Sequence, residues 1–228
     1  MLRDFHVERG SEKVEVFLVF FIKILYVYGL FTSLQILVIN KEMENLFPDY
    51  FEIKESDVTF ESLLIDENLT QERTTELKKY QMLFIPIRNY RNNEGYYFYN
   101  STRDFYIQSK NESPENHFEY YTEKNKYKEL LLNSTELYLG TILLKDIILP
   151  IAIKLLNKFL LKKLLNNDDK VIINIIVQNT NTNKSEMIEF RGTKQDFEKK
   201  VINALQLYSK EGKLILPKES GRKIDVLY

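Results

Sequence analysis

The last third of the chain contains two segments typical of β-strands, followed by a segment with the start signal and apolar spacing of a helix. This combination restricts the possible folds more than any other feature. Residues 171–178 (VIINIIVQ) are almost entirely apolar and rich in β-branched side chains, which is typical of a buried strand. After the polar loop 179–184, residues 185–190 alternate polar and apolar side chains, as a half-buried strand does. The two segments together predict a β-hairpin.

A helix is predicted directly after this hairpin. Gly192 is expected to end the second strand, and Thr193 is placed to cap the helix, with Asp196 three residues later in a near capping box. One helical face then carries the apolar residues Phe197, Val201, Ala204, Leu205 and Tyr208. Because one hairpin and one helix cannot bury all of their apolar surface, the β-hairpin–helix module over 169–228 needs a further layer.

The segment 134–168 is the natural partner for that module, because its apolar residues follow the spacing of a long helix. Gly140 and Pro150 lie inside the pattern. A proline removes a helical hydrogen bond and clashes with the preceding turn, so we expect a kink or break near 149–150. The segment is therefore predicted to be a long interrupted helix.

Residues 43–133 are predicted to form a mixed helix–strand domain. Helical patterns cover 57–66, 70–80, 103–110 and 124–132, while strand patterns cover 82–87, 95–100 and 118–122, with a hairpin across 82–100. Together with the C-terminal module, these elements predict an α+β protein.

A long apolar segment precedes all of these elements, at 16–39. As a helix it would extend about 36 Å, enough to cross the hydrocarbon core of a bilayer. Its seventeen Val, Leu, Ile and Phe residues favour insertion, and Lys23 opposes it. We predict a single membrane anchor here, which would make the chain a single-pass membrane protein. Two alternatives are a buried segment of a soluble core and a start assigned too early, with translation beginning at Met43 and a cytoplasmic product.

Composition removes several classes of function. The chain has no cysteine, which excludes disulfides and cysteine nucleophiles, and it has only two histidines. Its seven glycines form neither of the phosphate-binding patterns GxGxxG and GxxxxGK(S/T). We predict no catalytic residue, no metal site and no cofactor. The net charge of −1 gives no general affinity for nucleic acid. Asp49, Glu52 and Lys54 follow the order of a nuclease motif, but their spacing is too short to place metal ligands on separate strands, and we interpret them as part of a solvated loop.

The segment around the aromatic residues 96–99 is a weak candidate for binding anions or single-stranded nucleic acid. Arginines flank tyrosines that could stack on bases, and a predicted helix start could add backbone N–H groups. The residues concerned are Arg88, Arg91, Ser101, Thr102 and Arg103. The alternative interpretation is an aromatic strand covered on both faces, followed by an ordinary helix cap at Ser101 and Thr102.

A second weak candidate is the basic amphipathic segment 151–165 (IAIKLLNKFLLKKLL). Its lysines would form a membrane-surface patch: Lys154, Lys158, Lys162 and Lys163. The interpretation we favour is a core helix whose lysines remain in water.

These observations favour a non-catalytic, partner-binding or regulatory protein with an unknown protein partner, tethered to a membrane through 16–39. One alternative is a carboxylate-dependent Mg²⁺ enzyme acting on nucleic acid or phosphate esters, because the 33 Asp and Glu residues leave such a site open. The other is a membrane-active effector that uses 151–165.

Overall fold

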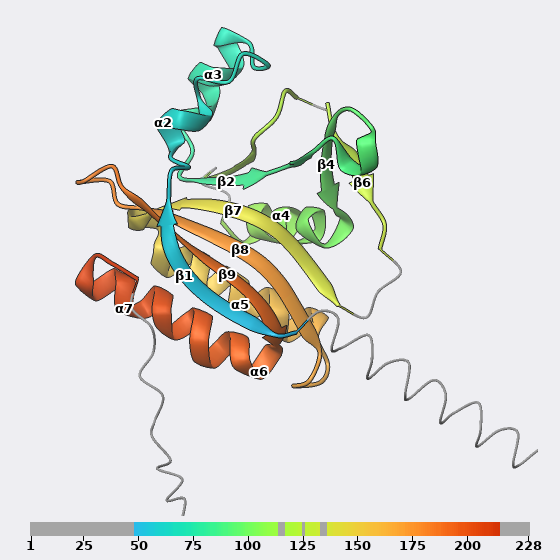
Figure 1. Cartoon of the computed structure of the whole chain (residues 1–228), viewed down its shortest axis with the longest axis vertical. Coiled ribbons are helices and arrows are strands. Elements are labelled where there is room, and N and C mark those ends of the chain that lie inside the picture. Colours follow the sequence, from blue (N-terminus) through green and yellow to red (C-terminus); the bar gives the residue numbers. More distant parts are fainter. Residues whose placement is uncertain (1–47, 114–116, 125, 133–135, 215–228) are drawn as a thin grey trace, which may run out of the picture. The chain divides into compact units, whose positions relative to one another are not determined.

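A mixed six-stranded sheet organises the chain. The computed structural model describes residues 48–113, 117–124, 126–132 and 136–214, and the predicted anchor 16–39 therefore lies outside the described residues. The strands follow the order β1-β9-β8-β7-β2-β5 (Figure 1). They are β1 (Tyr50–Ser56), β2 (Met82–Ile85), β5 (Phe118–Tyr120), β7 (Leu137–Lys145), β8 (Lys170–Gln178) and β9 (Ser185–Thr193). The predicted α+β class is confirmed.

The pairing of these strands joins distant parts of the sequence. β7 and β8 are parallel and are connected by helix α5 (Leu149–Lys163), while β8 and β9 form the predicted antiparallel hairpin. β1 pairs antiparallel with β9, β2 pairs antiparallel with β7, and β5 lies parallel to β2. The sheet thus takes strands from each of the segments 43–133, 134–168 and 169–228.

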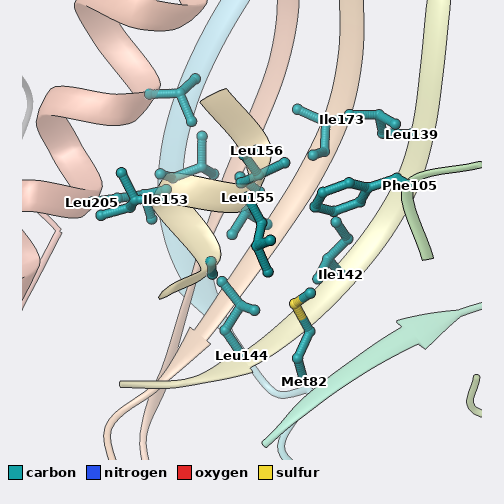
Figure 2. Packing of buried hydrophobic residues seen from close by; sticks show 14 of the residues in the cluster. Met82, Phe105, Leu139, Ile142, Leu144, Ile153, Leu155, Leu156, Ile173 and Leu205 are labelled. Atoms are coloured by element: carbon teal, nitrogen blue, oxygen red, sulfur yellow. The ribbon is translucent and has the colours of Figure 1, made fainter. Parts of the chain in front are cut away.

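One face of the sheet carries the main hydrophobic core. Helix α4 (Asn100–Glu112), helix α5 and the C-terminal helix contribute to this core together with alternate residues of the strands. Figure 2 shows Leu155 and Leu156 of α5 close to Leu139 and Ile173 of the sheet. Phe105 of α4 lies beside them and contacts Phe159 of α5, with ring centroids 5.1 Å apart.

Part of the opposite face is covered by two short helices, α2 (Phe60–Leu63) and α3 (Gln71–Leu77). They bury a smaller apolar cluster formed by Phe60, Leu77, Leu83, Tyr121, Leu143 and Ile176. Thr59 caps α2 and Thr70 caps α3, because each side-chain oxygen accepts a hydrogen bond from a backbone N–H of the first turn. The two predicted helices in this region are therefore confirmed, in shorter form.

A second, three-stranded sheet holds β3 (Ile87–Arg88), β4 (Tyr96–Tyr99) and β6 (Lys128–Leu130). β3 and β4 form the hairpin predicted within 82–100, and the short 3-10 helix η1 (Tyr90–Asn92) lies in the connection between them. β6 corrects the helix expected over 124–132, since residues 128–130 pair parallel with β4. This pairing is a long-range contact that no local pattern encodes.

The C-terminal module agrees most closely with the sequence. Thr193 accepts a hydrogen bond from the backbone N–H of Asp196 at 3.1 Å, and the helix continues through α6 (Lys194–Asp196), the π-helical turn η3 (Phe197–Ile202) and α7 (Asn203–Glu211). All five residues of the predicted apolar stripe are buried. Gly192 does not end the strand, which runs to Thr193. A Cβ atom at Gly192 would lie 2.8 Å from the Phe190 ring, so the position requires glycine for close packing.

The long interrupted helix expected over 134–168 is wrong in its first half. Residues 137–145 form strand β7, which is followed by the 3-10 turn η2 (Asp146–Ile148) and then by α5. Pro150 lies in the first turn of α5, where its missing N–H has no helical acceptor, so it begins the helix and does not break it. Gly140 has a φ of 68° beside the β-bulge of β7, a conformation that favours glycine.

Candidate functional site

The three arginines of the predicted anion site are spread over separate interactions. Arg88 forms an ion pair with Asp66 and lies over the Tyr96 ring at 5.5 Å. Arg103 forms an ion pair with Glu129 at 3.1 Å. Arg91 lies over the ring of its neighbour Tyr90 at 5.1 Å. These contacts do not converge on a common point for an anion.

Ser101 and Thr102 do not cap a helix. Helix α4 begins at Asn100 with Tyr99 as N-cap; Tyr99 makes no side-chain cap bond, and the Asn100 side chain accepts from the backbone N–H of Ser101 at 2.9 Å. Ser101 and Thr102 lie inside the helix and are buried. Their hydroxyls donate to the carbonyls of Tyr138 and Leu139 respectively, the second at 3.1 Å. Both residues thus attach α4 to β7.

The aromatic strand β4 is covered over its central residues. Tyr97 and Phe98 are buried, and the ring of Phe98 contacts that of Tyr120 at 4.5 Å. Tyr99 is half-buried against Tyr138, with centroids 5.2 Å apart. The strand therefore contributes mainly to packing, and a base could reach only its half-buried tyrosines.

Asp66 is the strongest electrostatic feature of this region, and the sequence did not single it out. Burial opposes its charge, but hydrogen bonds from Asn68, from the Tyr121 hydroxyl and from Arg88 outweigh it and lower the pKa of the carboxyl to about 2. Asp66 is thus held ionised as the partner of Arg88. This arrangement fixes the loop after α2 against the small sheet.

Arg73 is a second residue that sequence reasoning missed. Its side chain is only 4% exposed, and its guanidinium donates to the carbonyls of Thr122 and Tyr120 at 2.8 and 3.0 Å. The same group forms ion pairs with Glu76 at 2.9 Å and Glu119 at 3.5 Å. The guanidinium nitrogens of Arg73 are all used in these contacts. Arg73 therefore joins α3 to β5 and has no donor directed at a ligand.

A shallow hollow of about 340 Å³ lies beside the carboxyl ends of the parallel strands β7 and β8. Lys145 ends β7, and its amine lies 4.6 Å from the Phe60 ring centroid. The buried Gln178 ends β8, accepts from the backbone N–H of Phe60 at 2.7 Å and donates to Glu61 at 2.8 Å. Lys78 also lines the hollow. Such an edge is a common ligand position, but here Gln178 and Glu61 are bonded to each other and the Lys145 amine lies against the Phe60 ring.

A second hollow, of about 370 Å³, lies between helices α4 and α5. Lys162 and Lys163 line it together with Asp104 and Glu112. Lys163 forms an ion pair with Asp104, and Lys158 pairs with Glu112 at 2.9 Å. The lining is close to neutral, so the hollow itself offers no net attraction for an anion.

The outer face of α5 combines cationic and apolar side chains. Its inner face, including Leu155, Leu156 and Phe159, is buried in the core, as expected for a core helix. Of the seven exposed residues of α5, Lys163 lies towards α4, where it pairs with Asp104, and five others fall within an arc of about 100° at 100° per residue. They are Ile151, Lys154, Lys158, Leu161 and Lys162.

Four exposed aliphatic residues belong to this surface. They are Ile147 (60% exposed) just before α5, Ile151 (37%) and Leu161 (63%) on it, and Leu165 (89%) just after it. Only eight large apolar side chains are exposed in the described part of the chain, and half of them lie on α5 or next to its ends. We call these four residues, together with Lys154, Lys158, Lys162 and Lys163, the α5 surface. Among the described residues, Lys154 and Lys162 have no carboxylate within ion-pair distance.

Two further findings bear on function. Within the described ranges, no group of three or more His, Asp or Glu side chains is arranged to hold a metal ion. No helix in the same part of the chain is both long and apolar enough to cross a bilayer. Comparison with family models, with curated proteins and with solved structures found no match to the chain.

Proposed function

We propose that this protein is a non-catalytic binding module that lies against an anionic membrane through the α5 surface, with 16–39 as its tether. The observation that carries the proposal is the coincidence of four exposed aliphatic side chains, two on α5 and two next to its ends, with the exposed lysines of that helix. Soluble proteins usually expose large apolar residues singly, so a group of them among cations is typical of a membrane-contacting face.

The α5 surface supports docking but not insertion of the helix. Leu155, Leu156 and Phe159 hold the helix in the core, so entering the bilayer as an amphipathic peptide would require the domain to unfold. The outward residues can reach the headgroup region without any such change. This argument favours a folded peripheral module over the membrane-active effector.

The binding free energy can be bounded from the same residues. Each lysine near an anionic surface contributes about 1 kcal/mol, and Lys158 and Lys163 contribute less because Glu112 and Asp104 accompany them. Partial burial of a few aliphatic side chains adds a similar amount. A total of a few kcal/mol gives reversible binding, and stable attachment requires a second signal, which an anchor at 16–39 would supply.

The same orientation leaves a protein-binding face directed away from the bilayer. Helix α5 covers one face of the sheet, while α2 and α3 cover only part of the other (Figure 1). The rest of that second face carries polar pairs: Lys54–Glu189 at 2.8 Å, with side chains 40% and 25% exposed, and the less exposed Arg191–Glu136 at 2.6 Å. A module docked through α5 would present these groups to a protein partner.

Vesicle co-sedimentation of the fragment beginning at Met43 tests the docking separately from the anchor. The fragment should bind phosphatidylcholine vesicles that contain phosphatidylglycerol, bind neutral vesicles poorly, and release as salt is raised. The double variant K154E/K162E should bind the anionic vesicles at least about tenfold more weakly, because two attractive charges become repulsive.

The matched control is K78E/K79E, which makes the same charge change at exposed positions on the side of the sheet covered by α3. It should bind like the unaltered fragment, and both variants should unfold cooperatively. Equal vesicle binding by K154E/K162E and the control would refute membrane docking through α5. For the full chain, we expect retention in carbonate-washed membranes, and release would refute the anchor.

A further inference from the structure

Strand β1 is an edge strand whose second side is open among the described residues. It pairs with β9 along all seven of its residues, and the strand order ends there. This placement corrects the interpretation of Asp49, Glu52 and Lys54 as part of a solvated loop. Glu52 and Lys54 lie on the strand, and Asp49 precedes it and forms an ion pair with Lys170 at 2.6 Å. An open edge presents unpaired backbone donors and acceptors, so it is a template for another strand.

The sequence of β1, YFEIKES, is self-complementary when two copies run antiparallel about Ile53. In that register Ile53 faces Ile53 of the second copy. Glu52 faces Lys54 of the second copy, and Lys54 faces Glu52 of the second copy. Directly opposed charges of opposite sign stabilise a strand pair, and the two-fold symmetry makes both pairs identical.

Neighbouring registers lack this complementarity. Antiparallel hydrogen bonding allows shifts of the two-fold centre by one residue, to Glu52 or to Lys54. If the two-fold centre lies at Glu52, the Glu52 carboxylates of the two copies face each other and only residues 50–54 are paired. If it lies at Lys54, the two Lys54 ammonium groups face each other and only residues 52–56 are paired. The register about Ile53 is the one that pairs the whole strand and satisfies both charges.

The side chains concerned are accessible to a second copy. Glu52 is 58% exposed and Lys54 is 40% exposed, and both lie on the sheet face opposite the main core. Lys54 already contacts Glu189 at 2.8 Å, and Glu52 lies beside it, with the amine and carboxylate 3.9 Å apart. Edge charges of a single sign would repel a second copy. The alternating signs of β1 instead permit one pairing and disfavour the others.

We propose that two copies of this chain associate through β1, antiparallel about Ile53, so that two six-stranded sheets become one continuous sheet. Two seven-residue strands form a small interface compared with the roughly 1,200–2,000 Å² of stable complexes. The dimer should therefore be weak and depend strongly on the Glu52–Lys54 pairs. This proposal is independent of membrane docking.

Charge exchange in the full chain, purified in a neutral detergent, tests the proposal by analytical ultracentrifugation. In an E52K dimer, lysines of the two copies face each other, and in a K54E dimer, carboxylates do. Each variant should therefore dimerise about tenfold more weakly than the unaltered chain. Mixing E52K with K54E should restore a dimer, because every cross-strand pair is then of opposite sign. A monomeric unaltered chain, or a mixture no more associated than its components, would overturn the proposal.

Cysteine cross-linking provides a second readout, which reports which positions lie next to each other. The chain contains no cysteine, so each introduced thiol is unique. A mixture of E52C and K54C should form disulfide dimers faster than either variant alone, because positions 52 and 54 are direct neighbours in the proposed register and identical positions are diagonal. The control N181C, in the exposed β8–β9 loop, should cross-link slowest. Equal rates for all of these samples would mean that β1 is not the interface.

Discussion

Replacing Phe197 with alanine tests whether the C-terminal helix contacts the sheet as the structure places it. The side chain is fully buried, and its ring meets that of Phe190 edge-on, with centroids 5.4 Å apart. A phenylalanine buries about 200 Å². At about 25 cal/mol per Å² its removal would cost about 5 kcal/mol, at the top of the 3–5 kcal/mol measured for such changes.

The surroundings favour the upper half of that range. The Phe190 ring packs closely against Gly192 and also contacts the Phe51 ring, with centroids 6.5 Å apart, so it has little room to move into the cavity left by Phe197. A cavity that cannot collapse costs more than one that can. We therefore expect F197A to lose about 4–5 kcal/mol of unfolding free energy, a large share of a typical 5–15 kcal/mol.

Two matched changes on the same helix set the scale. T193A removes the cap hydrogen bond to Asp196 and should cost about 1 kcal/mol. K199A removes an exposed side chain and should change stability by less than about 0.5 kcal/mol. Urea titration followed by circular dichroism would give all three values. If F197A proved as mild as K199A, the helix would not pack as described, and its apolar stripe would be free to bind a partner.

Two further predictions concern the buried charges. Asp66 has a pKa of about 2 in the folded protein, against its usual 3.8. Its ionised form therefore stabilises the fold above about pH 4 by on the order of 2 kcal/mol. This contribution is lost as the pH falls toward 2. D66N should lower stability at neutral pH and flatten the acid dependence in urea titrations between those pH values, and an unchanged pH profile would contradict the Arg88–Asp66 pair. R73A should cost about 1–3 kcal/mol, because it leaves the Thr122 carbonyl without its side-chain donor and removes one donor each from Glu76 and the Tyr120 carbonyl. R73K should recover little of this loss, since an ammonium cannot reproduce the fork, and near-complete recovery in thermal unfolding would contradict that role.

The candidate site was partly visible in the sequence. The helical wheel of 151–165 places Lys154, Lys158 and Lys162 on one side without any tertiary information. The same wheel places Ile151 and Leu161 on that side, but it could not show whether they lie in water, because every Ile and Leu of the segment is equally apolar. Which of them face the core depends on where the sheet and α4 lie. The burial of Arg73 likewise follows from carbonyls that approach it from β5.

Local signals determined the C-terminal half of the fold. A β-branched run, a short polar loop, a threonine cap and a helical stripe all act over a few residues, so the hairpin 170–193 and its helix could be predicted directly. Strand β7 could not be predicted in this way. Residues 137–145 are apolar in an almost continuous run because they pack on both faces, and such a run has neither the period of a strand nor a feature that excludes a helix. Pairing with β8, which lies more than thirty residues further along the chain, and with β2, which lies far earlier in it, decided its conformation, because these two partners satisfy the strand's backbone hydrogen bonds.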